Sequence, residues 1–300
     1  MNINKKFYDW VFKNIESQKD KTVIVTGANS GIGYYTALGL ARMGANVIIA
    51  GRNKQKIDIA IEEMNQEDLE GTLSFGLLDL SSFKSIREFT KEFKQKHSHL
   101  DMLINNAGVM MPPESKTQEG FELQFGVNFL GHFLLTDLLY DKLKSTPDSR
   151  VVTLSSIAHR DATIDFENLR IEKAYDAKRE YYQSKLADLV FALELAKKIK
   201  ENGDSITSVA CHPGFTQTEL QRYIDPEILK KMNFMDTWQG SLPTLLAATS
   251  MKAKSGEYYG PDGDGEFSGF PALGVIGESA VDPELGKKLW SLAQDIITKN

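Results

Sequence analysis

The sequence predicts an α/β protein in which a doubly wound parallel sheet carries helices on both faces. Short β-branched runs alternate with longer amphipathic stretches from Lys21 onward, an order that is typical of repeated strand–helix–strand units. The short runs are apolar at nearly every position, as expected for strands covered on both faces. A glycine-rich turn joins the first run to a helical stretch. Right-handed crossovers then place the ligand crevice at the carboxyl ends of the strands.

Length and composition predict one large folded unit. The chain has 300 residues, of which 41% are apolar and 10% aromatic, so we expect a single domain over residues 21–300 after an N-terminal segment 1–20. Lys and Arg number 35 against 41 Asp and Glu, which gives a net charge of −6, and no long basic run is present. This balance argues against nucleic acid as a partner.

The N-terminal segment 1–20 has an amphipathic pattern. Apolar side chains recur at helical spacing with lysines nearby, namely Ile3, Phe7, Val11 and Ile15 with Lys5, Lys6 and Lys13. Such a helix either lies on a lipid surface, which would give peripheral membrane contact, or packs against its own domain. Asp9 and Glu16 dilute the basic charge, so the pattern favours packing.

The sequence predicts a soluble protein of the cytoplasm. No apolar run approaches the roughly 18 to 20 residues that span a bilayer, and charges stand where a signal peptide needs apolar residues. The single cysteine, Cys211, has no intramolecular disulfide partner and lies in an apolar run, which indicates a reducing compartment. Monomer and homodimer both fit the sequence.

Strands are predicted where β-branched and other apolar residues form short runs. The six runs are Thr22 to Val25, Asn46 to Ala50, Leu73 to Leu78, Met102 to Ile104, Val151 to Leu154 and Ser205 to Ala210. Aromatic residues punctuate the glycine-rich stretch 256–277, so we predict a packed loop there. The last helix is predicted to start with Asp282 as N-cap and Pro283 in its first turn. Its core face is Leu285, Leu289 and Leu292.

The first predicted strand leads into Thr26-Gly27-Ala28-Asn29-Ser30-Gly31-Ile32-Gly33 and then into a helical run. Glycines let the backbone turn tightly and approach a pyrophosphate, whose charge is met by the free N–H groups at the helix start. The spacing is Gly-x-x-x-Gly-x-Gly and differs from the fingerprint Gly-x-Gly-x-x-Gly. The predicted dinucleotide-binding residues are Gly27, Asn29, Ser30, Gly31, Ile32 and Gly33. The alternative is an ordinary tight turn.

The end of the second predicted strand indicates which dinucleotide is bound. Enzymes that prefer NAD place an acidic residue there to bind the ribose hydroxyls, whereas this chain has Gly51, Arg52 and Asn53. A guanidinium forms forked, charge-assisted hydrogen bonds with phosphate, so we predict that Arg52 favours NADP(H) over NAD(H). Asn53 is also predicted to bind the cofactor. The alternative is a solvated surface arginine.

Further motifs follow in a fixed order: Asp79-Leu80, Asn105-Asn106-Ala107-Gly108, Asn128, Ser156, Tyr181-x-x-x-Lys185 and Pro213-Gly214. Together with the glycine turn they make the chain resemble the short-chain dehydrogenase/reductase family over residues 21 to about 260. Three short sequence motifs resemble its retinol dehydrogenase and WW-domain oxidoreductase branch, namely Gly51-Arg52-Asn53, Ser155-Ser156-Ile157-Ala158-His159 and Ser184-Lys185-Leu186-Ala187.

The resemblance implies a Rossmann fold and roles for these residues. Asp79 and Leu80 would flank the adenine, and Asn106, Ala107 and Gly108 would line the cofactor crevice. The nicotinamide end would be held by Pro213, Gly214, Thr216 and Thr218. Lys185 would also bind the nicotinamide ribose, and Asn128 would hold a water that links Lys185 to solvent. The alternative for Asn128 is a satisfied buried amide.

The chemistry requires a proton donor, because hydride transfer to a carbonyl leaves an alkoxide. Tyr181 and Lys185 share a helix face at i, i+4, whereas Tyr182 is rotated by about 100° and is predicted to point elsewhere. A cation about 4 Å away, at an effective dielectric of about 20, favours the phenolate by about 4 kcal/mol before screening. We therefore predict that Lys185 lowers the pKa of Tyr181.

Ser156 follows the strand that ends at Leu154, and its hydroxyl is predicted to hold the substrate oxygen against Tyr181. Motif position selects it over Ser155. The long connection 215–238 is predicted to be a substrate lid whose apolar residues either cover a lipophilic pocket or simply pack: Tyr223, Ile224, Ile228, Leu229, Met232, Phe234 and Met235. The five histidines form no convincing ligand set, so we predict no metal.

These features predict an NADP(H)-dependent oxidoreductase that interconverts a small-molecule alcohol and its carbonyl, lipophilic in the manner of retinol dehydrogenases. The intact set Asn128, Ser156, Tyr181 and Lys185 favours an enzyme. The alternative is a regulatory or scaffold protein that binds NADPH without significant turnover.

Overall fold

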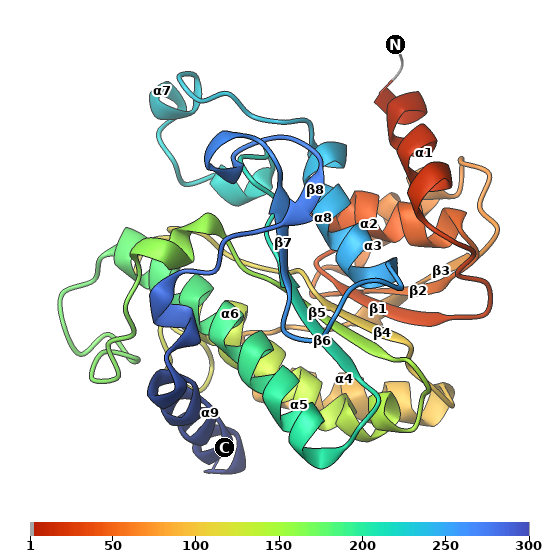
Figure 1. Ribbon diagram of the computed structural model, residues 1–300. Coiled ribbons are helices and arrows are strands. Elements are labelled where there is room, and N and C mark those ends of the chain that lie inside the picture. The colour runs from red at the N-terminus through yellow and green to blue at the C-terminus, as the bar shows by residue number, and fades with distance from the viewer. Residues whose placement is uncertain (1–2, 300) are drawn as a thin grey trace.

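The structure, a computed structural model, describes residues 3–299 and the side chains of residues 5–299 (Figure 1). Its described residues form a sheet of eight strands in the order β3-β2-β1-β4-β5-β6-β7-β8. Neighbouring strands pair in parallel, except that β8 is antiparallel to β7. The strands are β1 Thr22–Thr26, β2 Asn46–Gly51, β3 Thr72–Leu77, β4 Met102–Asn105, β5 Arg150–Leu154, β6 Thr207–Cys211, β7 Tyr258–Pro261 and β8 Pro271–Leu273.

Helices cover both faces of the sheet, and each layer encloses its own apolar core (Figure 1). One layer contains α1 Ile3–Asn14, α2 Gly31–Arg42, α3 Lys54–Met64 and α8 Thr237–Thr249. The other contains α4 Phe83–Lys96, α5 Gly131–Lys144, α6 Ala177–Asn202 and α9 Pro283–Lys299. The short helix α7 Pro226–Leu229 lies in the connection after β6, outside both layers. The predicted doubly wound fold is confirmed.

The central strands are buried on both faces, which explains their nearly unbroken apolar sequences. All five residues of β1 are buried; Ile24 belongs to one core, whereas Val23 and Val25 belong to the other, because successive side chains of a strand alternate between faces. The parallel register brings the carboxyl ends of β1, β2, β4, β5 and β6 to one edge of the sheet. The loops that follow these strands therefore meet in one place.

The predicted packed loop over residues 256–277 is wrong in part, because two short strands form within it. β7 extends the sheet in parallel with β6, with Tyr258 opposite Ala210 and Tyr259 opposite Cys211, and β8 returns antiparallel to β7. Tyr258 is among the largest fully buried side chains. These strands are fixed by pairing with a distant part of the chain, so the local sequence carries little signal of them.

The N-terminal helix α1 packs on its own domain, against α2 and α8. Phe7, Val11 and Ile15 are buried there, and the ring of Phe7 meets that of Tyr35 edge-on with 5.2 Å between centroids. The side chain of Ile3, assigned to the same apolar face, lies outside the described residues. Within residues 3–299, no helix combines the length and the apolar character needed to cross a membrane.

Candidate active site

A cavity of about 890 Å³ opens where the carboxyl ends of the central strands meet. Its walls come from the loops after β1, β2, β4, β5 and β6, as the doubly wound topology requires. The predicted site residues that line it are Gly27, Asn29, Ser30, Gly31, Ile32, Gly33, Arg52, Asn53, Asp79, Leu80, Asn106, Ala107, Gly108, Ser156, Tyr181, Lys185, Pro213, Gly214, Thr216 and Thr218. Asn128 is the exception, because it lies behind the cavity wall.

The glycine turn leaves no room for side chains. A β-carbon at Gly27, whose φ is +68°, would lie 2.9 Å from Cβ of Ala107, and one at Gly33 would lie 2.5 Å from Nδ2 of Asn106. α2 begins at Gly31, within this turn, and the side chain of Ser30 does not cap it. The first N–H groups of α2 therefore remain available at the cavity wall, so the turn fits a dinucleotide pyrophosphate.

Thr26, the last residue of β1, ties the loop after β4 to the glycine turn. Its Oγ1 accepts hydrogen bonds from the N–H groups of Asn106 and Ala107, both at 2.9 Å, and lies 2.9 Å from Nε2 of His132. Nδ2 of Asn106 donates to the carbonyl oxygen of Thr26 at 2.7 Å. The loop that ends at Gly108 is thus fixed as one wall of the crevice.

Two cationic side chains lie at the β2 end of the cavity. Arg52 is exposed, lines the cavity and forms no ion pair within residues 3–299. Asn53 caps α3, since its Oδ1 accepts from the N–H of Lys56 at 3.0 Å. Lys56 also lines the cavity, and the sequence prediction missed it. Its Nζ lies 4.0 Å from Oε2 of Glu219. The place of Lys56 in the first turn of α3, close to Arg52 in the sequence, was the available signal.

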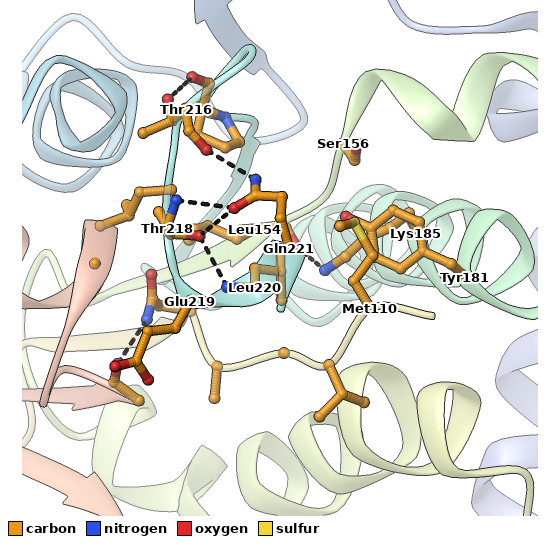
Figure 2. Close-up of a pocket in the computed structure, with 18 of the residues that line it drawn as sticks. Met110, Leu154, Ser156, Tyr181, Lys185, Thr216, Thr218, Glu219, Leu220 and Gln221 are labelled. Carbon is orange, nitrogen blue, oxygen red and sulfur yellow. Dashed lines mark hydrogen bonds between the residues drawn. The ribbon is translucent and has the colours of Figure 1, made fainter. Parts of the chain in front are cut away.

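α6 carries the predicted proton-transfer pair into the cavity. Asp176 is the N-cap of this helix, and its side chain accepts from the N–H groups of Lys178 and Arg179 at 3.0 Å each. Tyr181 and Lys185 lie on one face of α6 and both line the cavity, as the i, i+4 spacing predicts (Figure 2).

The ammonium group of Lys185 is buried and held by two acceptors. Nζ donates to the carbonyl oxygen of Leu154 at 3.0 Å, drawn as a dashed line in Figure 2, and to Oδ2 of Asp188 at 2.8 Å. Burial acts to lower the pKa of Lys185, but Asp188 and Tyr181 raise it, and the net shift is upward. Lys185 is therefore charged at neutral pH.

The predicted lowering of the Tyr181 pKa is wrong in its net direction. Lys185 does act to lower this pKa, and so does a hydrogen bond with Ser156, but burial of the phenol is the larger effect and raises it. Asp188 adds to the increase because its negative charge opposes the phenolate. The sequence shows the nearby cation, whereas desolvation follows only from the packing of α6. Tyr181 is therefore a protonated phenol at neutral pH.

The structure separates the two serines after β5. Oγ of Ser155 donates to the backbone carbonyl of Lys185 at 2.7 Å and so ties β5 to α6. Ser156 lines the cavity opposite Tyr181 (Figure 2), and its Oγ accepts from the N–H of Ala158 at 3.2 Å. The Ser156 hydroxyl is therefore the one that lies next to the Tyr181 phenol, in agreement with motif position.

Asn128 lies in a π-helical turn, Phe125–Leu130, directly before α5. Its Oδ1 accepts from the N–H of Val109 at 2.8 Å, and its Nδ2 donates to the Val109 carbonyl at 3.0 Å and to Oγ of Ser184 at 2.9 Å. This is the satisfied buried amide that the alternative interpretation described. The Asn128 amide fixes the cavity wall at Val109. The predicted role of Asn128 in holding a water stays a prediction.

The turn after β6 forms the wall at the nicotinamide end. Oγ1 of Thr216 donates to the carbonyl of Pro213 at 2.8 Å. Gln221, which the sequence prediction missed, braces this turn: its Nε2 donates to the Thr216 carbonyl at 2.9 Å and its Oε1 accepts from the N–H of Thr218 at 2.8 Å (Figure 2). These bonds fix the start of the lid.

Residues 215–238 extend from this turn along the cavity. A β-carbon at Gly31 would meet Cβ of Thr218 at 3.4 Å, so the lid contacts the glycine turn. The apolar lid residues that line the cavity are Phe215, Leu220, Tyr223, Ile224, Ile228, Leu229, Met232 and Phe234. Met235 is buried beside Gly214 instead. For this residue the alternative interpretation, packing within the protein, is the correct one.

Two more cavity residues differ from the sequence interpretation. Tyr182 also lines the cavity, so the expectation that it points elsewhere is wrong. Phe267 lines the cavity from the loop after β7. The neighbouring Glu266 anchors that loop, because its Oε2 lies 2.6 Å from Nη2 of Arg160 and 2.7 Å from Nε2 of His212. This ion pair with Arg160 and hydrogen bond with His212 join distant segments of the chain, so they give no local sequence signal.

Within residues 3–299, His, Cys, Asp and Glu side chains form no group of three or more that could hold a metal ion. His132 is engaged by the carbonyl of Asn128 at 2.7 Å, and burial lowers its pKa to about 4. Burial raises the pKa of the Cys211 thiol to about 12, so it is a neutral side chain and a poor nucleophile.

The fold and the site define a nicotinamide-dependent dehydrogenase. Residues 21–228 match the short chain dehydrogenase family, and the chain belongs to this family. The predicted resemblance is thereby confirmed. The protein is an oxidoreductase of alcohols and carbonyls in a family that binds a nicotinamide dinucleotide.

Curated relatives belong to the predicted branch. The chain is 42% identical to retinol dehydrogenase 13 of Mus musculus over 290 residues, which covers 92% of this chain and 84% of that protein. It is 40% identical to retinol dehydrogenase 11 of Homo sapiens, with 92% and 86% covered. A crystal structure of a protein from Mycobacterium paratuberculosis has a TM-score of 0.81 at 35% identity, and the match covers 95% of this chain and 96% of that one.

Proposed function

We propose that the protein is an NADP(H)-dependent oxidoreductase of lipophilic alcohols and carbonyls in which Tyr181 transfers the proton. The observation that carries this proposal is the buried pair Tyr181 and Lys185 beside Ser156, at a cavity whose other walls are a glycine turn and an apolar lid. The bound dinucleotide supplies or accepts the hydride.

The residues of the chain handle the oxygen and its proton. The Ser156 hydroxyl holds the carbonyl oxygen beside Tyr181, whose phenol donates the proton as the alkoxide forms. Lys185 then stabilises the phenolate that is left, because its ammonium lies on the same face of α6. Burial raises the pKa of Tyr181, so the phenol is protonated at neutral pH and can donate its proton to the forming alkoxide.

Preference for NADPH rests on Arg52, which lines the cavity at the end of β2 without an ion-pair partner within residues 3–299. Arg52→Asp should weaken NADPH binding by about 10- to 100-fold, since a charge-assisted contact to the 2′-phosphate contributes about 1.5–3 kcal/mol. NADH binding should change by less than about threefold. Fluorescence titration with each nucleotide measures both constants.

Lys54→Asp is the matched control for charge, because Lys54 opens α3 two residues later and does not line the cavity. It should leave both affinities near the wild-type values. Equal losses of NADPH and NADH binding in Arg52→Asp would remove the basis for the phosphate assignment.

The apolar lid supports a lipophilic substrate. Its residues share the cavity with Met110, Leu123 and Val127, so a substrate chain would be surrounded by hydrocarbon. In a series of straight-chain aldehydes, kcat/KM should rise by about fourfold per added methylene until the cavity is full, because burial of one methylene contributes about 0.8 kcal/mol. A flat or falling series would contradict a lipophilic pocket.

Turnover of a carbonyl panel, followed by nicotinamide absorbance, tests the proposal as a whole. Consumption of NADPH that depends on carbonyl and increases with enzyme is the expected result. Tight NADPH binding with no turnover of any carbonyl would instead support a cofactor-sensing protein. We also propose a cytoplasmic location, which imaging of the tagged full-length chain would test.

A further inference from the structure

Asp188 is a buried carboxylate one helical turn after Lys185 on α6. Its Oδ2 accepts from Lys185 Nζ at 2.8 Å, and the side chains of Lys185 and Asp188 are 6% and 2% exposed. Asp188 does not line the cavity, whereas Lys185 does. Asp188 therefore acts on the cavity from behind its wall, through its contact with Lys185 and through its charge near Tyr181.

Stability alone does not explain this carboxylate. Oδ1 of Asp188 is buried and has no hydrogen-bond partner within the described part of the chain, so half of its acceptor capacity is lost on folding. Buried ion pairs are often no more stabilising than apolar side chains of the same volume, because both charges leave water. An amide or an apolar residue at position 188 would avoid the cost of burying a charge.

The contacts of Lys185 show what the carboxylate does. An ammonium has three N–H donors, and two of them are directed to the Leu154 carbonyl and to Asp188, on β5 and α6. The third is left for the cavity that Lys185 lines. Without Asp188, a second N–H would lose its acceptor and the direction of the third would no longer be fixed.

The other titratable groups around Lys185 do not replace this charge. They are Tyr181 on α6, Cys211 on β6 and His132 on α5. Burial raises the pKa of Tyr181 and of Cys211, so both are neutral, and burial lowers the pKa of His132, so it is neutral as well. Of these four groups, Asp188 is the one that is an anion above pH 7.

We propose that Asp188 is a positioning residue for the reaction: its carboxylate keeps the buried Lys185 ammonium charged and fixes its third N–H toward the cavity. This inference rests on the proposed role of Lys185 in proton transfer. It adds a third member, one that contacts neither substrate nor cofactor, to the pair on α6.

The expected effect of Asp188→Asn is a shift of the alkaline limb in the pH profile of kcat/KM. Asp188 raises the pKa of both Lys185 and Tyr181. Carbonyl reduction stops when either group loses its proton, so Asp188→Asn should move the alkaline limb of kcat/KM toward neutral pH by about 1 to 3 pH units. Burial raises the pKa of Asp188 itself to about 7, so the comparison is made above that pH, where the wild-type carboxylate is ionised.

Glu194→Gln is the matched control. Glu194 lies on the same helix, is mostly buried and forms an i, i+3 pair with Lys197 at 3.1 Å, but lies outside the cavity. This variant should keep the wild-type alkaline limb. An Asp188→Asn enzyme that is folded and active but has an unshifted limb would overturn the proposal, because a purely structural carboxylate changes stability and leaves the profile in place.

A double-mutant cycle, measured by the Tm of each variant, gives a second test that needs no turnover. Lys185→Met leaves a buried carboxylate unpaired and Asp188→Asn leaves a buried ammonium unpaired, so each should lower Tm. The double variant removes both charges and should regain at least about half of the Tm lost by the worse single variant. Additive losses would overturn the pairing, including the case in which Asp188→Asn does not fold. If the wild-type protein reduces no carbonyl, the proposed function fails. The Tm values of the double-mutant cycle then decide on their own whether Lys185 and Asp188 are coupled.

Discussion

Tyr181→Phe should lower kcat/KM for carbonyl reduction by about 10²- to 10⁴-fold, because the variant keeps the ring and removes the proton donor. NADPH affinity should change little, since the glycine turn and Arg52 are untouched. Stopped-flow or steady-state absorbance of NADPH measures the rate, and fluorescence titration measures binding. Turnover within tenfold of wild type would mean that another group donates the proton.

Tyr182→Phe is the contrasting variant, because it removes the same hydroxyl from the adjacent residue. Tyr182 lines the cavity, but it is not among the groups whose charge shifts the pKa of Lys185. We expect a loss below about tenfold, which would show that position on α6, rather than a nearby phenol, determines the proton donor.

Gly33→Ala should weaken dinucleotide binding by about 10²-fold or more, the second large effect we expect. The added methyl group would lie 2.5 Å from Nδ2 of Asn106 and 2.8 Å from the carbonyl oxygen of Gly27, so the turn and the loop after β4 must separate. Both segments line the cavity, and their displacement removes the surface that meets the pyrophosphate. Calorimetric titration with NADPH measures the loss.

Gly203→Ala controls for a general loss of stability. Gly203 ends α6 with φ +69°, and nothing lies within 4 Å of an added β-carbon. The left-handed backbone makes the substitution cost about 1–2 kcal/mol, so Tm should fall while NADPH affinity is retained. An unchanged affinity in Gly33→Ala would contradict the close fit of the turn to the cofactor.

The sheet and most of the site could be predicted from the sequence because their signals are local. The run at β1 is apolar on both faces, the glycine turn follows it directly, and Tyr181 and Lys185 are spaced by one helical turn. Each feature depends on neighbours within a few residues. Parallel topology then brings strand ends together, so residues distant in sequence meet without any further information.

The features that could not be predicted depend on packing between distant segments. β7 is placed by pairing with β6, and its own residues give only a weak pattern. The net pKa shift of Tyr181 depends on how deeply α6 is buried, which the i, i+4 spacing does not reveal. Asp188 had a sequence signal, since it is a charged residue within the apolar stretch of α6 that follows Lys185, but its burial gives that signal its meaning.

The loop after β7 separates selectivity from reactivity. Glu266 fastens it to Arg160 and His212, whereas Phe267 next to it contributes to the cavity wall. Because the ion pair with Arg160 holds this loop, substitutions at Phe267 are expected to leave the position of Tyr181 on α6 unchanged. Libraries that vary Phe267 and the apolar lid residues are therefore expected to change which carbonyls are accepted while Tyr181 and Lys185 keep the same reaction.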